Sequence, residues 1–439
     1  MHAAEARVGM ANSRKHVFYG WWIALAAAIG VGLGGPPILV FSFPVFLPHF
    51  LKEFHTGRAA IAVAFSLHNV VSALASPLVG RLIDRFGVRK IVLPGTLLFA
   101  VWLLANQFVT VSVFGIYLFN AIGGLLGIGC GPIPYSTAIS NWFDRRRGSA
   151  LAAMMVGTGA AAMVMPSIMQ RLIAALNWRT AYSLYGAAML ALTLPVVAIL
   201  LKDRPAELGQ LPDGAAVSPA TSNRDLHSGL TLQEARRTTT FWWLIGAVVL
   251  LGASVHACVI HMPAMLTDAG ATARMAALAS SFAGAGLLMG RVGTGFFLDR
   301  YSGPRIAVCF SAGAALGIIV LLTVHAGPLP FFGAFLAGLG MGADADLVAY
   351  LSSRYFGLRC FAQISGFIFG SFVLAGAAGA YLMGLGFDRT GSYTAPLLCF
   401  LVAVLCAAAL FSQLGPYRFT AGEAGVPEAA QPQAATAVS

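Results

Sequence analysis

Long apolar stretches recur along the whole chain and are separated by short polar segments. Each stretch has enough residues to cross a hydrocarbon core of about 30 Å as a helix. We place twelve expected spans at residues 18–46, 59–82, 91–110, 112–139, 148–170, 180–201, 240–266, 275–298, 305–325, 329–352, 362–386 and 392–414. The pattern therefore predicts an all-α polytopic membrane protein with twelve transmembrane helices.

The longest internal polar segment divides these spans into two groups of six. It covers residues 202–239 and contains the turn-rich sequence PDGAAVSPATSN. We expect a six-helix half at 18–201, a cytoplasmic linker at 202–239 and a second six-helix half at 240–414. Residues 1–17 are the expected cytoplasmic N-terminus, and residues 415–439, rich in Ala, Pro and Gln, are expected to be a disordered cytoplasmic tail.

The composition supports a membrane location, because 58% of the residues are hydrophobic and only 10% are charged, against about 25% in soluble proteins. Of the 27 Lys and Arg residues, six fall on the expected outer side, one lies within a span and the other 20 lie at the inner ends and loops. By the positive-inside rule, this asymmetry predicts that both termini are cytoplasmic. The net charge of +11 is thus spread over loops facing one side of the bilayer, which argues against a nucleic-acid partner.

The two expected halves repeat a loop motif. GRLIDRFGVRK (80–90) follows the second span and GFFLDRYSGPR (295–305) follows the eighth, and Ser302 is one extra residue in the second copy. Both copies keep Gly-x-x-x-Asp-Arg followed by Gly-x-Arg. The repeated residues are Gly80, Asp84, Arg85 and Arg89 in the first copy and Gly295, Asp299, Arg300 and Arg305 in the second. Duplicated halves of this kind generally enclose a central site and rock about it.

These paired loops resemble those of the major facilitator superfamily, and the resemblance covers essentially all twelve spans. Within it the chain resembles the monocarboxylate porter and oxalate/formate exchanger branch, through YGWW (19–22), an arginine within the eighth span, and NWFDRRRGSA before the fifth. The resemblance implies alternating access between two pseudo-symmetric halves. It also implies that Arg291 binds a substrate carboxylate, and that Asp84, and by extension Asp299, contact neighbouring helix ends and hold one conformation.

Two features of the proton-linked animal members are absent from this chain. The stretch GGPPILVFSFP late in the first span has no lysine, and Leu287 stands where those members have an aspartate one turn before the span-eight arginine. The exact substrate and coupling mechanism therefore do not carry over. The fifth span, GSALAAMMVGTGAAAMVMP, matches the exchanger signature of the superfamily only in part, because Pro166 falls four residues late.

Three charged residues fall deep within spans: Arg291, Asp344 and Asp346. Charged groups are costly in hydrocarbon, so they are expected to face protein or a water-filled cavity. Arg291 and Asp346 each lie eight residues before an inner-loop residue, about 12 Å from the inner end of their helices. An ion pair between them is feasible, and it could be purely structural. Alternatively, a substrate anion replaces an aspartate as the partner of Arg291, whose planar guanidinium matches a carboxylate.

The two aspartates are not expected to play the same role. A spacing of two residues turns about 200° around a helix, so Asp344 and Asp346 point to nearly opposite sides. We expect one to face the cavity and the other to contact a neighbouring helix, and we favour Asp346 for the cavity. Protonation of the aspartate that Arg291 releases would couple uptake of the anion to a proton.

Further polar residues within the spans are candidates for binding the substrate. They are His256, Asn69, Asn120, Tyr135 and Tyr350. Each of them can equally be explained as a helix-packing contact or a hydrogen-bonded structural residue. The stretch GGLLGIGCGPIPY (123–135) resembles a nucleotide-binding loop only superficially, since no strand precedes it, and close helix contact with a proline-distorted helix explains it better.

The sequence thus predicts a secondary transporter of small carboxylate anions in the inner membrane, coupled to protons and active as a monomer in the bilayer. No nucleophile–base pair or metal-ligand cluster is evident, so we expect no enzyme activity, no cofactor and no metal. The alternatives are an organic anion exchanger, a proton-driven exporter of cationic compounds, and a transporter-like nutrient receptor. An exporter would leave Arg291 without an obvious purpose, and the short linker and tail show no evident signalling domain.

Overall fold

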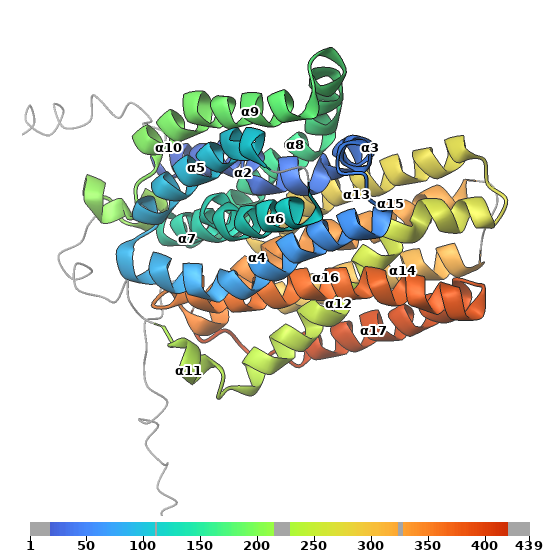
Figure 1. The fold of residues 1–439 in the computed structure, drawn as a ribbon. Helices are drawn as coiled ribbons and strands as arrows, with labels where there is room; N and C mark the ends of the chain where they lie inside the picture. Colours follow the sequence, from blue (N-terminus) through green and yellow to red (C-terminus); the bar gives the residue numbers. More distant parts are fainter. Residues whose placement is uncertain (1–17, 110–111, 215–228, 324–327, 420–439) are drawn as a thin grey trace, which may run out of the picture.

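A computed structural model describes residues 18–109, 112–214, 229–323 and 328–419, and within them the chain forms helices and no strand. Twelve of the helical segments are long and apolar enough to span a membrane. They run side by side as one bundle, and the beginning of the first span, the end of the last and the connection between the halves all lie at the same end (Figure 1). We call this end the linker end.

The first half contributes six spans, several of them broken into shorter helices. Its elements are α2 (Gly20–Gly32), η1 (Pro37–Phe41), α3 (Phe43–Glu53), α4 (Arg58–Phe86), α5 (Arg89–Leu104), η2 (Ala105–Phe108), α6 (Val113–Gly127), η3 (Ile128–Cys130), α7 (Pro132–Trp142), α8 (Arg147–Ala175), α9 (Trp178–Ala188), η4 (Met189–Thr193) and α10 (Leu194–Leu200).

The second half consists of longer, uninterrupted helices. They are α12 (Thr239–Asp268), α13 (Ala273–Leu298), α14 (Gly303–Thr323), α15 (Leu329–Phe356), α16 (Phe361–Thr390) and α17 (Thr394–Ser412). Between the halves, the described part of the linker forms the short elements η5 (Pro205–Leu208), η6 (Pro212–Gly214) and α11 (Leu232–Ala235). The spans in both halves start and end within a few residues of the predicted positions.

The first span differs from its prediction, which ran unbroken over 18–46. Pro36 and Pro37 have no N–H to donate, so regular α-helical pairing is interrupted, and a π-helical turn follows α2. The span itself is Gly20–Phe41, and residues 43–46 belong instead to α3. This helix is seen end-on in Figure 1, so it runs across the bundle axis.

The fourth span is interrupted where the sequence predicts proline distortion. Helix α6 ends at Gly127, a short 3-10 turn follows, and α7 begins with Pro132 in its first turn. Proline is tolerated there because the first amides of a helix have no helical partner.

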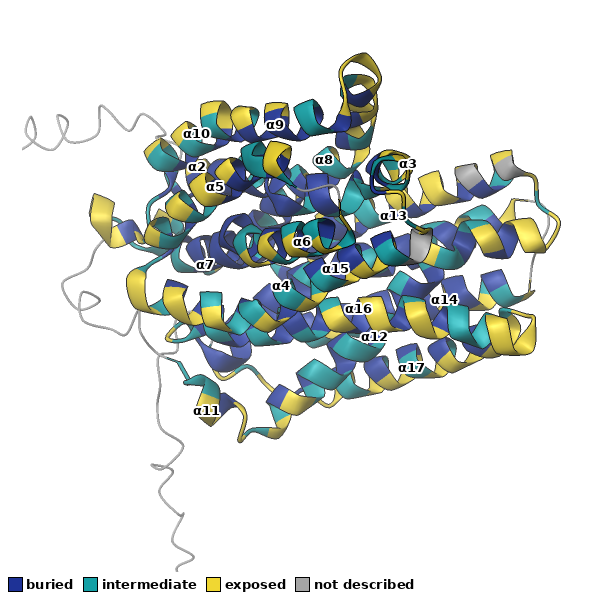
Figure 2. Ribbon diagram, viewed as in Figure 1, coloured by how far each residue is buried: buried dark blue, intermediate teal, exposed yellow. Residues whose placement is uncertain are grey.

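The buried residues of the bundle face its interior, while exposed positions lie along its outer surface (Figure 2). Large apolar side chains are among the exposed ones, including Leu74, Ile199 and Tyr381. A soluble protein rarely exposes so much contiguous apolar surface, whereas lipid accepts it. The burial pattern therefore supports the prediction of twelve membrane spans.

The expectation of a disordered tail from residue 415 is wrong for its first residues. The carbonyl of Gly415 accepts a 2.7 Å hydrogen bond from the hydroxyl of Tyr355, and the backbone N–H of Phe419 donates to the carbonyl of Arg354. Residues 415–419 are thus packed on the linker end. The remaining tail residues, 420–439, and the N-terminal segment 1–17 lie outside the described residues.

A glycine seam joins α13 to α15 in the second half. Gly286 and Gly290 on α13 lie against the carbonyls of Phe335 and Leu339, and on α15 Gly338 and Gly342 lie against the carbonyls of Ala283 and Leu287. A Cβ at any of the four glycines would overlap the opposing carbonyl. Small residues spaced by four let two membrane helices approach this closely.

Replacing Gly342 by Ala is expected to separate these helices and to destabilise the protein by about 1–3 kcal/mol, the usual cost of overpacking. Gly284→Ala is the matched control, because a Cβ at Gly284 meets nothing within 4 Å. Thermal unfolding of the purified variants in detergent measures the difference. Equal unfolding midpoints for Gly342→Ala and Gly284→Ala would contradict the tight seam.

Candidate transport site

The glycine seam sets the position of the arginine within the eighth span. Arg291 directly follows Gly290 on α13, about 100° further around the helix, and it is buried. Its Nη1 donates a 3.2 Å hydrogen bond to the carbonyl of Met155 on α8, in the opposite half. Its Nε is buried with no hydrogen-bond partner. Arg291 therefore bridges the two halves with part of its donor capacity unused.

The two intramembrane aspartates lie close enough to act on Arg291 electrostatically. Both are buried, and the Oδ2 atom of each has no hydrogen-bond partner. Asp344 uses its Oδ1 locally, accepting a 2.6 Å hydrogen bond from the N–H of Ala345. No nitrogen–oxygen distance of 4.0 Å or less joins Arg291 to either aspartate. The ion pair of a purely structural bridge is thus not formed in this conformation.

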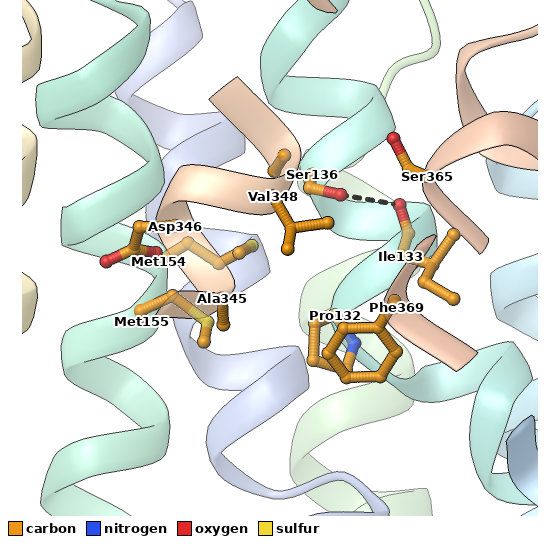
Figure 3. A pocket seen from close by; sticks show the side chains of 11 residues that line it. Pro132, Ile133, Ser136, Met154, Met155, Ala345, Asp346, Val348, Ser365 and Phe369 are labelled. Atoms are coloured by element: carbon orange, nitrogen blue, oxygen red, sulfur yellow. Dashed lines mark hydrogen bonds between the residues drawn. The ribbon is translucent and has the colours of Figure 1, made fainter. Parts of the chain in front are cut away.

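A small cavity between the two halves contains one of these aspartates. Asp346 lines it, together with Met154 and Met155 on α8 and residues of α7 and α16, whereas Asp344 does not. Asp346 lies beside the two methionines, while Pro132, Phe369 and Ser365 lie on the other side (Figure 3). Helical spacing indicated only that the two aspartates point to opposite sides, and Asp346, which we favoured for the cavity, is the one that lines this small cavity.

The cavity is mostly apolar and small. Its other lining residues are Pro132, Ile133, Ser136, Ala345, Val348, Ala349, Ser365 and Phe369. The hydroxyl of Ser136 donates a 2.9 Å hydrogen bond to the carbonyl of Ile133, whereas the hydroxyl of Ser365 has no hydrogen-bond partner. The volume of about 20 Å³ is enough for roughly one water molecule. An organic anion can enter only if the two halves move apart.

Three of the other candidate binding residues are engaged within the helices. Asn69 and Asn120 donate to carbonyls four residues earlier in their own helices, at 3.1 and 2.9 Å. The Nδ1 of His256 lies 2.9 Å from the carbonyl of Gly252, also four residues earlier, and its ring packs against Phe372. None of the three lines the cavity at Asp346.

The two tyrosine candidates also lie outside the cavity lining. The Tyr350 hydroxyl donates a 2.9 Å hydrogen bond to the carbonyl of Leu298, tying α15 to the end of α13. Tyr135 is fully buried against Gly30 of α2, and its hydroxyl has no partner. In this conformation the candidates thus fall into three groups. Asp346 lines the cavity, Arg291 and Asp344 are its charged neighbours, and the remaining candidates make contacts within or between helices.

The carboxylates of the repeated loops each cap a helix of the opposite half. Asp84 accepts hydrogen bonds from the N–H groups of Ala362 and Gln363 at the start of α16, at 3.0 and 2.8 Å. Asp299 accepts from the N–H groups of Gly148 and Ser149 at the start of α8, at 2.7 and 3.0 Å, and from the Ser149 hydroxyl. The negative charge of each carboxylate also interacts favourably with the positive end of the helix dipole. The duplicated motif thus fastens the halves twice.

The glycines of the repeated motif pack beside these caps, whereas its arginines do not. Gly80 lies against the carbonyl of Ala362, and Gly295 lies against Gly148 and Ala152. Among the arginines, Arg85 and Arg300 lie over Phe86 and Phe296, Arg89 binds the carbonyl of Ala198, and Arg305 is exposed. The glycines permit the close approach, while the arginines stay within their own half.

A further attachment between the halves was not predicted. Arg354 on α15 binds Asp144 of the first half, with its Nη1 2.8 Å from Oδ1 and its Nη2 2.7 Å from the backbone carbonyl. Arg147 donates to the hydroxyl of Ser353 at 2.9 Å. From the sequence these arginines are inner-loop charges only, because the repeat shows which positions of the two halves correspond but not which of them are in contact. Two carboxylate caps, the Arg354–Asp144 pair and the Arg147–Ser353 hydrogen bond therefore close the linker end between the halves.

Removing a capping carboxylate is expected to loosen this closure. Cys360 immediately precedes α16, whose first amides Asp84 binds, and it is partly buried. In a variant that keeps Cys360 as its one cysteine, Asp84→Ala should speed thiol labelling and change the transport rate, while the preference among substrates stays the same. Arg85→Gln is the control, because it changes the next residue, whose side chain is exposed and does not bind α16. Unchanged labelling in Asp84→Ala would contradict the closure.

Comparison with known proteins agrees with this arrangement. The sequence pattern of the family described as Major Facilitator Superfamily matches residues 21–368. The chain belongs to the major facilitator superfamily. Proteins of this superfamily are transporters and not enzymes.

Among the curated relatives of this superfamily member, monocarboxylate transporter 11 of Mus musculus is 29% identical over 391 residues, covering 86% of this chain and 84% of the relative. The uncharacterised MFS-type transporter YcxA of Bacillus subtilis is 26% identical over 366 residues, covering 80% and 85%. The chain is thus a superfamily transporter related to proteins named monocarboxylate transporters, and a multi-pass membrane protein.

Solved structures show the same fold. The proton:xylose symporter XylE aligns with a TM-score of 0.74 at 13% identity, covering 91% of this chain and 96% of that chain. The fucose:proton symporter FucP of E. coli aligns with a TM-score of 0.68, also at 13% identity, covering 91% and 100%. The predicted fold of two six-helix halves is confirmed.

Proposed function

We propose that this protein is a secondary active transporter that carries small organic carboxylate anions across the inner membrane, coupled to protons. Arg291 binds the carboxylate, Asp346 takes the proton, and Asp344 supplies counter-charge. Both chain ends lie in the cytoplasm, which the excess of Lys and Arg at the linker end supports.

The observation that carries this proposal is the incomplete pairing of Arg291. A buried guanidinium is costly unless charge or hydrogen bonds compensate it. Here Arg291 has a partnerless Nε and one 3.2 Å hydrogen bond to the carbonyl of Met155. A carboxylate is the ligand that the planar fork fits best. Arg291 itself does not line the cavity, but Met155, whose carbonyl it binds, does. An anion that enters as the halves move apart would then take the place of that carbonyl on the guanidinium.

The position of Asp346 supports proton coupling. It is the cavity residue that can gain or lose a proton, and its Oδ2 has no partner. An anion at Arg291 would lie near a second negative charge unless Asp346 were protonated. Carboxylate and proton therefore bind together more favourably than either binds alone, which is the thermodynamic basis of symport.

Alternating access follows from the attachments at the linker end. The caps at Asp84 and Asp299 and the Arg354–Asp144 pair hold that end together. Rocking of the two halves would break these contacts and expose the cavity on that side. The same motion changes the contact between Arg291 and Met155, so occupancy of the site is linked to the position of the halves.

Reconstitution in vesicles tests the proposal. Uptake of labelled mono- and dicarboxylates is measured with and without an inward proton gradient, and with and without anion inside. Uptake that rises with the proton gradient supports symport. Uptake that needs only an internal counter-anion would show an exchanger, and the absence of carboxylate uptake under all conditions would overturn the proposal.

A further inference from the structure

A second, larger groove lies at the linker end of the second half, away from the transport site. Its volume is about 780 Å³, within the range of small-molecule sites. It lies between the start of α14 and the end of α17, and the segment Gly415–Tyr417 forms one wall. Its lining includes Ser302, Arg305, Val308 and Tyr355.

Arg305 is the charged residue of this groove. It is exposed, and within the described chain it has no hydrogen bond, ion pair or ring contact. The other motif arginines have such contacts. Arg85 and Arg300 lie over rings, and Arg89 binds a carbonyl. A guanidinium that lines a groove without a protein partner is suited to an anionic ligand.

The first half provides an internal comparison for this position. Arg89, the counterpart of Arg305, donates from Nη2 to the carbonyl of Ala198 at 2.7 Å, and its backbone N–H donates to Asp203 at 2.7 Å. A protein carboxylate therefore supplies the anion there. Asp203 follows the sixth span, whereas residues 413–419, which follow the twelfth, contain no Asp or Glu.

In the second half an uncharged group binds a different backbone amide, two residues before Arg305. The hydroxyl of Tyr417 accepts the N–H of Gly303 at the start of α14. Burial raises the pKa of Tyr417 to about 12, so the hydroxyl remains neutral. The second half thus keeps the arginine but has a neutral hydroxyl, and no carboxylate, in the segment that follows its last span, so the positive charge of Arg305 is not balanced there.

The walls of the groove indicate what kind of anion would bind. Val308 and Cys309 lie three and four residues after Arg305 on α14, about one helical turn further towards the membrane interior. Leu414 adds a second apolar contact. Leu414 comes just after the end of α17, so it is the α14 wall that becomes apolar further in. A polar outer end and an apolar inner wall are what the headgroup and upper acyl chains of a lipid require.

We propose that this groove binds an anionic phospholipid, with Arg305 on the phosphate, the Ser302 hydroxyl beside it, and the acyl chains along Val308 and Cys309. The site is separate from the transport cavity and does not depend on which substrate is carried. It gives the second half a lipid anion where the first half has its own aspartate.

Native mass spectrometry of the purified full-length protein tests this site. The protein is titrated with equal amounts of phosphatidylglycerol and phosphatidylcholine that carry identical acyl chains, and the ratio of bound lipids is measured. The wild type should favour phosphatidylglycerol. Arg305→Gln should reduce that preference about fivefold, the effect of one basic residue at a membrane surface. Arg300→Gln removes a charge from the same loop and should leave it unchanged.

Three further measurements distinguish the lipid from other anions. Val308→Trp fills the apolar part of the groove without changing charge, and it should reduce binding of both lipids. Glycerol phosphate, which has no acyl chains, should not displace phosphatidylglycerol. A variant that ends at Phe419 should keep the wild-type preference for phosphatidylglycerol. As a control, thermal unfolding in phosphatidylcholine should show that each variant is folded.

Several results would overturn the proposal. They are an Arg305→Gln variant that keeps the full preference, an equal loss in Arg300→Gln, and displacement of the lipid by glycerol phosphate, which would indicate a soluble anion. A preference that appears only after residues 420–439 are removed would show that the tail occupies the groove instead.

Discussion

Arg291→Gln is expected to reduce carboxylate uptake by roughly 30-fold or more. Truncating one partner of a buried charged hydrogen-bonding pair costs about 2–5 kcal/mol, and every 1.4 kcal/mol is a factor of ten. The glutamine removes the charge and the planar fork but keeps a side chain that can still contact Met155. Initial rates of labelled carboxylate uptake in vesicles measure the effect.

Two companion variants show whether the guanidinium itself is responsible. Arg274→Gln removes a charge from the exposed outer end of the same helix and should retain wild-type uptake. Arg291→Lys keeps the charge but loses the fork, so it should recover only part of the rate. If Arg291→Gln transports as fast as Arg274→Gln, Arg291 does not bind the substrate.

Asp346→Asn is expected to abolish accumulation driven by a proton gradient while preserving exchange between labelled and unlabelled anion. One pH unit corresponds to about 1.4 kcal/mol per proton, so a transporter coupled to one proton can accumulate its anion up to about tenfold per unit. Asparagine resembles a permanently protonated aspartate. The anion can then still bind and cross, but no proton is released on the other side.

Asp344→Asn makes the same chemical change two residues away, outside the cavity lining. It should alter affinity for the anion, because Asp344 also acts on Arg291, but gradient-driven accumulation should remain. Accumulation and exchange are measured in the same vesicle preparations with an imposed gradient. Loss of accumulation in Asp344→Asn, with accumulation retained in Asp346→Asn, would exchange the assigned roles.

The bilayer explains why so much of the fold could be read from the sequence. Backbone groups in hydrocarbon must be paired within the helix, so each crossing needs a long apolar run, and these runs are visible without knowledge of any neighbour. Duplication was equally visible, because Asp84 and Asp299 occupy equivalent positions in two copies of one motif. The first span was the exception. Its apolar run continues into α3, and hydropathy does not report that the helix changes direction near Pro36 and Pro37.

The candidate site was predicted only in its charged residues. Arg291, Asp344 and Asp346 stood out because each is costly in a membrane, and depth counted along the helices placed them near one another. The apolar walls of the cavity, including Met154 and Phe369, had no such signal, because an apolar residue facing a cavity looks the same in sequence as one facing lipid. The polar candidates Asn69, Asn120 and Tyr350 proved to bond within or between helices in this conformation.

The sequence by itself determined the twelve spans and the two related halves. It also singled out three charged residues within the spans, because a charge in hydrocarbon is costly and indicates a functional site. These properties depend on single segments and on the solvent around them. Only the tertiary structure decided that Asp346 rather than Asp344 lines the cavity, that Arg291 reaches the carbonyl of Met155, and that Arg354 closes on Asp144. Each of these depends on how helices far apart in the chain rotate and pack against one another, and in this protein glycines such as Gly290 and Gly342 set that packing.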